Sequence, residues 1–126
     1  MDLSDVPLFA LADRRLAWVD ARQSMLARNI ANADTPHWQS HDLKPFAATL
    51  TQASVQLART DPAHLAPAGS TGGFGQSAQV AEKAPDGNSV AIDKELAKIA
   101  DTDAAHDLVT NLTKKYLGLV RTAIGR

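Results

Sequence analysis

Apolar residues recur at heptad spacing near both ends of the chain, and this repeat constrains the fold more than any other feature of the sequence. At the N-terminal end the repeat runs from Val6 to Ala33, with steps that alternate between three and four residues. Such spacing places the side chains along one stripe of an α-helix. The predicted stripe consists of Phe9, Ala12, Leu16, Val19, Leu26, Ile30 and Ala33.

Gln23 is the one polar residue in this stripe. A polar side chain at a core-type position can fix the register or the partner of a helix pair, at a cost in stability. The alternative is an amide that tilts into solvent at the edge of the helix. The spacing alone leaves both interpretations open.

The C-terminal segment carries a second apolar stripe at heptad spacing. A turn-like PDGNS at residues 85–89 and an extended stretch at residues 90–92 precede Asp93 and Glu95, which predicts an N-cap at Asp93. We expect a helix from about Asp93 to Ile124, ended by Gly125. Its stripe comprises Ala105, Val109, Leu112, Tyr116, Leu119 and Ala123, widened by Leu117, Val120 and Ile124.

A second apolar patch lies at the start of this helix. Ile92, Leu96 and Ile99 form the patch, which falls out of phase with the later stripe across residues 101–107. We therefore expect a bend or a change of packing partner at residues 101–107.

The middle of the chain has a different composition. Residues 61–89 contain Pro62, Pro67, Pro85 and the sequence GSTGGFG, with few large apolar side chains, which predicts a flexible linker. Residues 46–58 are compatible with a short helix. The predicted organisation is an N-terminal helical segment at 1–34, a helix exit with a short helical or extended segment at 35–60, the linker at 61–89, and a C-terminal helical segment at 90–126.

The predicted fold class is mostly α, with two long terminal helices that form an antiparallel hairpin or coiled coil around a flexible or irregular central segment. A two-helix hairpin alone is marginally stable, because most helix stability comes from tertiary burial of the apolar face. Helices that also bury a second face against other subunits would be more stable. The pattern therefore favours assembly.

Composition narrows the possible functions. The net charge is -1 and no basic cluster is present, which argues against a nucleic-acid partner. The chain has no cysteine, so neither disulfides nor thiolate metal sites are available. No segment resembles a cleaved secretory signal, and none approaches the roughly 20 apolar residues of a membrane span. We expect no direct insertion into a membrane.

The stretch ARNIANADTPHWQSHD, residues 27–42, contains candidate metal ligands. His37 and His41 have the H-x-x-x-H spacing of two ligands on one helix face. Pro36 disfavours a helix there, because it drives the preceding residue toward extended backbone. A metal-dependent hydrolase is therefore a weak alternative, and we expect no metal or other cofactor.

Other catalytic patterns are also weak. His106 lies among aspartates, but on a helix these form an ordinary solvated face. The GSTGGFG glycines lack the lysine of a phosphate-binding loop, and no serine lies in a G-x-S-x-G turn. The sequence predicts neither an enzyme nor a small-molecule substrate.

Two asparagines mark the end of the first helix. Asn29 and Asn32 are neighbours on one helix surface, although asparagine is a poor residue for a helix interior. Either their amides bond the last carbonyls of the helix, or they bridge to a neighbouring chain while Pro36 and Trp38 turn the backbone into an extended contact segment. Spacing does not decide between the two.

The residues LARNIANADTP resemble the N-terminal signature of the bacterial flagellar rod and hook proteins. Similarity continues in TDPAHL at 60–65 and DGNSVAIDKELAKIA at 86–100. Within the signature, the resemblance assigns the helix exit to Asn29, Ile30, Asn32, Asp34, Thr35 and Pro36. Two departures stand out: His37 and Trp38 replace the family's usual Gly-Tyr, and AHDL at 105–108 replaces an aromatic-amide pattern.

The resemblance implies a structural subunit of the flagellar basal body, located in the periplasmic rod and exported by the flagellar type III apparatus without signal cleavage. Its partners would be its own copies, other rod and basal-body axial proteins, and the export apparatus. A small soluble helical adaptor or chaperone-like binding module is the alternative. The predicted subunit interface comprises Phe9, Leu16, Val19, Gln23, Leu26, Asn29, Ile30, Asn32, Asp34, Thr35, Pro36, Trp38, Leu96, Ile99, Val109, Leu112, Tyr116, Leu119, Val120 and Ile124.

Overall fold

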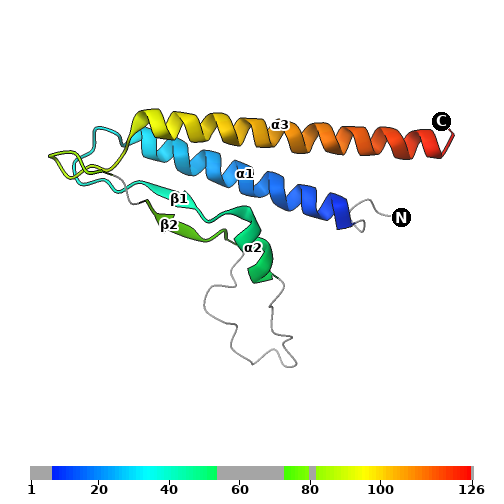
Figure 1. The fold of residues 1–126 in the computed structure, drawn as a ribbon, viewed down its shortest axis with the longest axis horizontal. Coiled ribbons are helices and arrows are strands. Elements are labelled where there is room, and N and C mark those ends of the chain that lie inside the picture. Colours follow the sequence, from blue (N-terminus) through cyan, green and yellow to red (C-terminus); the bar gives the residue numbers. More distant parts are fainter. Residues whose placement is uncertain (1–6, 54–72, 80–81, 126) are drawn as a thin grey trace, which may run out of the picture.

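Two long antiparallel helices dominate the computed structural model, which describes residues 7–53, 73–79 and 82–125 (Figure 1). The expected fold class, mostly α with two long terminal helices, is confirmed. In chain order the elements are α1 (Pro7–Ala31), β1 (His41–Leu43), α2 (Phe46–Ala53), β2 (Gln76–Ala78) and α3 (Ile92–Ala123).

Helix α1 is the central layer of the molecule. Figure 1 shows α3 along one side of α1 and the two strands along the other. The strands pair antiparallel, with His41 opposite Ala78 and Leu43 opposite Gln76. Both faces of α1 are therefore occupied within one subunit, whereas α3 packs mainly on α1 and also contacts Gln79 through Glu95 and Lys98.

The core is small and centred on α1. Trp18, Val19 and Leu43 form its buried cluster, and Leu26 is fully buried about two turns further along α1. Trp18 Nε1 donates a hydrogen bond to the Lys44 carbonyl at 3.0 Å, which satisfies its polar atom inside the cluster. Leu43 reaches this cluster from β1, so the strand pair contributes to the same core as the helices.

The start of α3 differs from the sequence prediction. The N-cap is Ala91 rather than Asp93, and Ile92 is the first helical residue rather than the last extended one. The Glu95 amide donates to the Ala91 carbonyl at 3.0 Å, so the first turn closes two residues earlier than expected. Asp93 lies inside that turn, where its charge still complements the helix dipole. At the other end, Gly125 follows the helix with a φ of 79°, as expected for a terminating glycine.

Of the two alternatives expected at residues 101–107, a bend or a change of packing partner, the bend is absent, because α3 continues unbroken through them. The change of phase has another cause. Ile92 and Leu96 lie on an exposed face, at 47% and 52% exposure, whereas Glu95 and Thr102 face α1 and are buried. Near the start of α3, polar residues thus occupy the positions that face α1. The apolar patch therefore faces solvent without a bend in the helix.

The middle of the chain is partly ordered into elements that the sequence did not indicate. β2 lies within the segment predicted as a linker, and the rest of that prediction, at residues 61–72 and 80–81, falls outside the described residues. Helix α2 begins at Phe46 as expected and ends at Ala53; residues 54–58 of the predicted helix also fall outside.

Candidate subunit interface and helix-exit motif

Asn29 joins three elements of the subunit. Its Nδ2 donates to the His41 carbonyl at 2.7 Å and to Glu95 Oε2 at 2.8 Å, and its Oδ1 accepts from the His41 amide at 3.3 Å. The side chain is 1% exposed. Asn29 therefore bonds within its own chain, and it connects α1 to both β1 and α3.

Glu95 is the buried charge of this cluster, at 1% exposure. Besides the Asn29 amide, its carboxylate accepts from Lys98 Nζ at 2.8 Å and from Gln79 Nε2 at 3.4 Å. Lys98 Nζ also donates to the Gln79 side chain. A buried carboxylate requires such partners, because an unpaired one carries the full cost of its desolvation. We call Asn29, Gln79, Glu95 and Lys98 the Asn29–Glu95 cluster.

Asn88 holds the exit of α1. Its Nδ2 lies 3.0 Å from the Asn32 carbonyl, 2.7 Å from that of Ala33 and 2.8 Å from that of Thr35. These residues follow the end of α1 at Ala31, and the carbonyls of Asn32 and Thr35 also accept from the backbone amides of Thr35 and Trp38. The Asn88 amide therefore adds a buried donor to a turn that already carries backbone hydrogen bonds. Asn88 is 4% exposed and belongs to the PDGNS segment, for which the sequence predicted a turn but no contact with the exit of α1.

Asn32 behaves as the local interpretation of the asparagine pair suggested. Its Nδ2 donates to the Arg28 carbonyl at 2.8 Å, and its Oδ1 accepts from Thr35 Oγ1 at 3.2 Å. The two asparagines thus differ in role. Asn32 closes its own helix end, whereas Asn29 makes long-range contacts within the subunit.

The segment after Pro36 lies beside residues 86–89. The His37 amide donates to the Asp86 carbonyl at 3.1 Å, and the Ser89 amide donates to the Trp38 carbonyl at 3.0 Å. Ser40 and Ser89, both 4% exposed or less, complete the pairing, since the Ser40 amide donates to Ser89 Oγ at 2.9 Å. Trp38 Nε1 is buried and has no hydrogen-bond partner among the described residues.

His37 takes a left-handed backbone conformation, with a φ of 61°. This region favours glycine and costs other residues on the order of 1 kcal/mol or more. The turn therefore has a conformation suited to glycine, although histidine occupies it. The imidazole of His37 lies against Gly87, where an added Cβ would be 2.5 Å from Nδ1.

His37 and His41 do not form a shared site. His37 sits in this left-handed turn, whereas His41 lies on β1 with Nδ1 2.8 Å from the Gln39 carbonyl. Within residues 7–53, 73–79 and 82–125, no group of three or more acidic or histidine side chains is placed to hold a metal ion.

Arg22 and Asp42 form a bidentate ion pair between α1 and β1, a contact that the sequence analysis missed. Nε and Nη2 of Arg22 each lie 2.9 Å from a carboxylate oxygen of Asp42. Burial opposes ionisation of Asp42, but the hydrogen bond and charge of Arg22 outweigh it, so the pKa of Asp42 lies below its usual value. The same hydrogen bond raises the pKa of Arg22. The pair fixes how β1 sits on α1.

Gln23, the polar residue of the α1 stripe, faces α3. Its Nε2 donates to Asp103 Oδ1 at 2.8 Å in an exposed hydrogen bond. The Gln23 amide therefore contacts α3 at the exposed edge of the α1–α3 pair.

The predicted interface residues fall into three groups by exposure. Val19, Leu26 and Asn29 are buried inside the subunit, so they support its own packing. The half-buried ones are Phe9, Leu16, Gln23, Ile30, Asn32, Trp38, Ile99 and Val109. The exposed ones are Asp34, Thr35, Pro36, Leu96, Leu112, Tyr116, Leu119, Val120 and Ile124.

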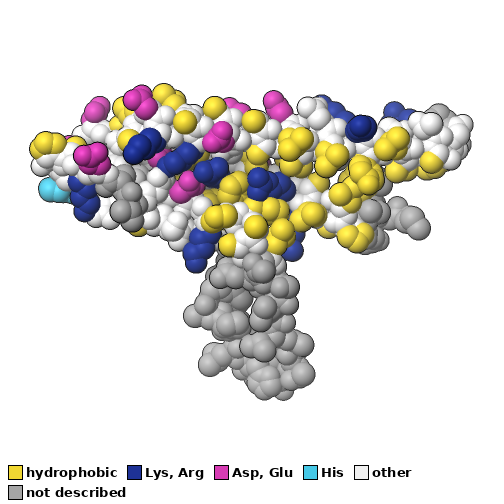
Figure 2. Space-filling model, in the orientation of Figure 1, with side chains coloured by type: hydrophobic (Ala, Val, Ile, Leu, Met, Phe, Trp, Pro, Cys, Tyr) yellow, Lys and Arg dark blue, Asp and Glu magenta, His cyan; other side chains and the backbone are white. Residues whose placement is uncertain are grey.

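Exposed apolar side chains concentrate on the second half of α3. Six large hydrophobic residues, five in α3 and Ile124 directly after it, are between 38% and 71% exposed, and Figure 2 shows hydrophobic side chains gathered over the half of the molecule that contains both termini. These residues are Leu108, Leu112, Tyr116, Leu119, Val120 and Ile124. Contiguous apolar surface of this kind marks an interaction site.

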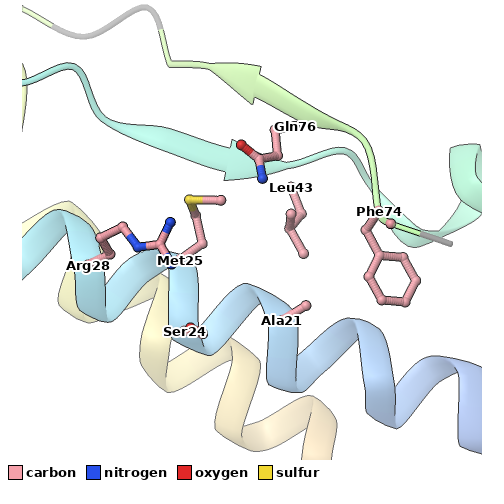
Figure 3. Close-up of a pocket in the computed structure, with 8 residues that line it drawn as sticks. Ala21, Ser24, Met25, Arg28, Leu43, Phe74 and Gln76 are labelled. Carbon is pink, nitrogen blue, oxygen red and sulfur yellow. The ribbon is translucent and has the colours of Figure 1, made fainter. Parts of the chain in front are cut away.

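An open groove lies between α1 and the strands. Met25 from α1, Leu43 from β1 and Phe74 point into it, and Arg28 lies at one end (Figure 3). Its polar lining residues are Ser24, Arg28 and Gln76, which include neither a carboxylate nor a histidine. No helix in the described part of the chain is long and apolar enough to cross a membrane.

Two flagellar rod proteins are similar in sequence to this chain. The chain is 31% identical to a flagellar basal body rod protein FlgB of Agrobacterium fabrum over 139 aligned positions, which cover 98% of this chain and 97% of the relative. It is also 31% identical to a FlgB of Proteus mirabilis over 112 positions, covering 78% and 79% of the two chains. A scan against protein-family models found no match.

Proposed function

The chain belongs to the FlgB family of flagellar basal body rod proteins, and on that premise we propose that it is a structural, non-catalytic subunit of the proximal rod. In this proposal its terminal helices pack against those of neighbouring subunits, and the resulting rod transmits torque. The partners are its own copies and other axial proteins of the basal body. The subunit reaches the periplasmic rod through the flagellar type III export apparatus without cleavage of a signal peptide.

The exposed apolar surface of α3 is the observation that carries this proposal. Leu112, Tyr116 and Leu119 all lie on the predicted stripe of α3, yet they are 47%, 43% and 58% exposed. A single subunit covers only part of its stripe, because the described part of α1 is shorter than α3 and β1 packs on α1. Neighbouring helices would remove this surface from water and gain about 25 cal/mol for each Å² buried.

The segments have separate roles in the proposal. Residues 1–34 and 90–126 act as the rod helices, and residues 35–60 carry the exit motif. Residues 61–89 connect them, and the described part of this segment pairs with the rest of the subunit through β2 and Asn88. The Asn29–Glu95 cluster and Asn88 support this division, since they hold the helix exit and the start of α3 together within one subunit. The exposed residues Asp34, Thr35 and Pro36 would then meet a neighbour in a fixed orientation.

Purified basal bodies provide the direct test. A tagged copy of the chain should be found in the rod fraction, and a strain lacking it should be non-motile until the wild-type chain is restored. A parallel fraction from a strain that expresses the same tag on an unrelated soluble protein is the control. Normal motility without the chain, or a tagged chain found only in the soluble fraction, would overturn the proposal.

A further inference from the structure

A second flank of α3 faces solvent, separate from the side that packs on α1. Leu108 is 69% exposed, the highest value among the large hydrophobic residues of α3, and Leu112 and Leu119 are also exposed. Asp101 and Lys115 are exposed as well. A row of exposed leucines with one acidic and one basic residue needs a partner that matches both features.

The spacing of this flank is symmetric about Leu108. Residues four, seven and eleven positions before and after Leu108 lie within about 40° of it on a helix of 3.6 residues per turn. Every one of these positions is exposed. We call this set the α3 flank: Ala97, Asp101, Ala104, Leu108, Leu112, Lys115 and Leu119.

The symmetry makes the α3 flank complementary to itself. If two α3 helices pair antiparallel with a twofold axis at Leu108, each residue meets the one at the opposite offset in the other copy. Asp101 then faces Lys115, which gives two ion pairs. The small residues Ala97 and Ala104 face Leu119 and Leu112, so bulky and small side chains interdigitate.

We propose that the α3 flank is a self-association site through which two copies of this chain form an antiparallel dimer about Leu108. The order of the charges selects this arrangement. In a parallel, in-register pair, Asp101 would face Asp101 and Lys115 would face Lys115, which is repulsive. A parallel pair staggered by 14 residues would restore the ion pair but place Leu108 opposite Lys94 or Thr122.

The dimer would be a closed assembly. A twofold contact uses the same patch on both copies and therefore cannot extend into a filament. It would cover the leucines of the free protein and would have to open before the same flank could meet a neighbour in a rod. The inference goes beyond the proposed rod function, since it concerns the free chain and can fail or hold independently of it.

Cysteine cross-linking tests the geometry directly, because the chain has no cysteine of its own. Under oxidation, Leu108→Cys should give a disulfide-linked dimer of the full-length chain. Ala97→Cys and Leu119→Cys should cross-link when mixed but not alone, because the two copies of either position lie about 33 Å apart across the axis. Asn111→Cys, exposed on α3 but off the flank, is the control.

The results separate the possible orientations. A dimer from Ala97→Cys alone and from Leu119→Cys alone would mean a parallel pair and would overturn the proposal. The proposal also fails if neither Leu108→Cys nor the mixture cross-links more than Asn111→Cys. Each variant replaces an exposed residue, so circular dichroism should show an unchanged helix content.

A charge exchange tests the ion pairs. Asp101→Lys should weaken dimerisation roughly tenfold in sedimentation equilibrium at low salt, because both ion pairs become repulsive. Adding Lys115→Asp to that variant should restore the wild-type dimer. Equal dissociation constants for the wild type, the single variant and the double variant would show that these residues do not face one another.

Discussion

The Asn29 amide donates a hydrogen bond to the Glu95 carboxylate at 2.8 Å, and both side chains are about 1% exposed. This contact joins the helix-exit motif of α1 to the first turns of α3, 66 residues later in the chain. The motif therefore has a structural role inside the subunit. An assembly surface built on α1 and α3 depends on this contact for its shape.

Replacing Asn29 with alanine should lower the free energy of unfolding by about 2 kcal/mol or more, because it removes a partner from a buried carboxylate. Chemical denaturation followed by circular dichroism measures the change. Asn32→Ala is the matched control, because Asn32 makes exposed contacts near its own helix end, and its effect should be clearly smaller. Equal losses in the two variants would contradict the assigned roles.

Asn88→Ala should cost about 1–3 kcal/mol, since three carbonyls at the exit of α1 lose a buried donor. Asn111→Ala, on the exposed side of α3, should change stability by less than about 0.5 kcal/mol. Hydrogen exchange provides a second readout, with faster exchange expected for the amides of residues 32–38 in Asn88→Ala. Unchanged exchange there would show that Asn88 does not hold the exit.

Gly87→Ala should destabilise the protein by about 1–3 kcal/mol, because the new Cβ would lie 2.5 Å from His37 Nδ1 and the φ of 81° disfavours alanine. His37→Gly should be neutral or stabilising by up to about 1 kcal/mol, since glycine tolerates the φ of 61°. In the double variant the clash disappears, so the loss should be smaller than the sum of the single changes. Strict additivity would argue against the contact.

Acid should weaken the protein partly through Asp42. Its pKa is lowered in the folded state, so the ion pair with Arg22 contributes fully above the unfolded pKa of about 4 and is lost as the pH falls through the lower folded value. The stability difference between wild type and Asp42→Asn should therefore shrink as the pH falls below about 4. A difference that stays constant from neutral pH into this acid range would show that the pair does not titrate as assigned.

Leu26→Asp and Leu112→Asp should both abolish motility, but for different reasons. Leu26 is fully buried in the subunit, so an aspartate there should prevent folding. Leu112 is 47% exposed, so Leu112→Asp should leave the helix content and the melting temperature nearly unchanged while assembly fails. Asn111→Asp places the same charge one residue away and should remain motile. A motile Leu112→Asp strain would exclude this side chain from the rod interface.

The sequence by itself determined the long helices, because a sustained heptad repeat has only one efficient way to bury its apolar residues. It also determined the end of α3 just before Gly125, because glycine has no Cβ and therefore tolerates the left-handed backbone. The family followed from the contiguous motif LARNIANADTP, which is legible without coordinates.

Only the tertiary structure decided which polar residues matter. Asn29 bonds Glu95, and Arg22 bonds Asp42. Asn88 bonds three carbonyls at the exit of α1, each at least 53 residues away in the chain. Three-residue strands such as β1 and β2 carry too little periodicity to be predicted, and they form because each satisfies the other's backbone while β1 packs on α1. Hydrogen bonds between distant segments leave no spacing pattern in the sequence, whereas the apolar stripe of a helix does.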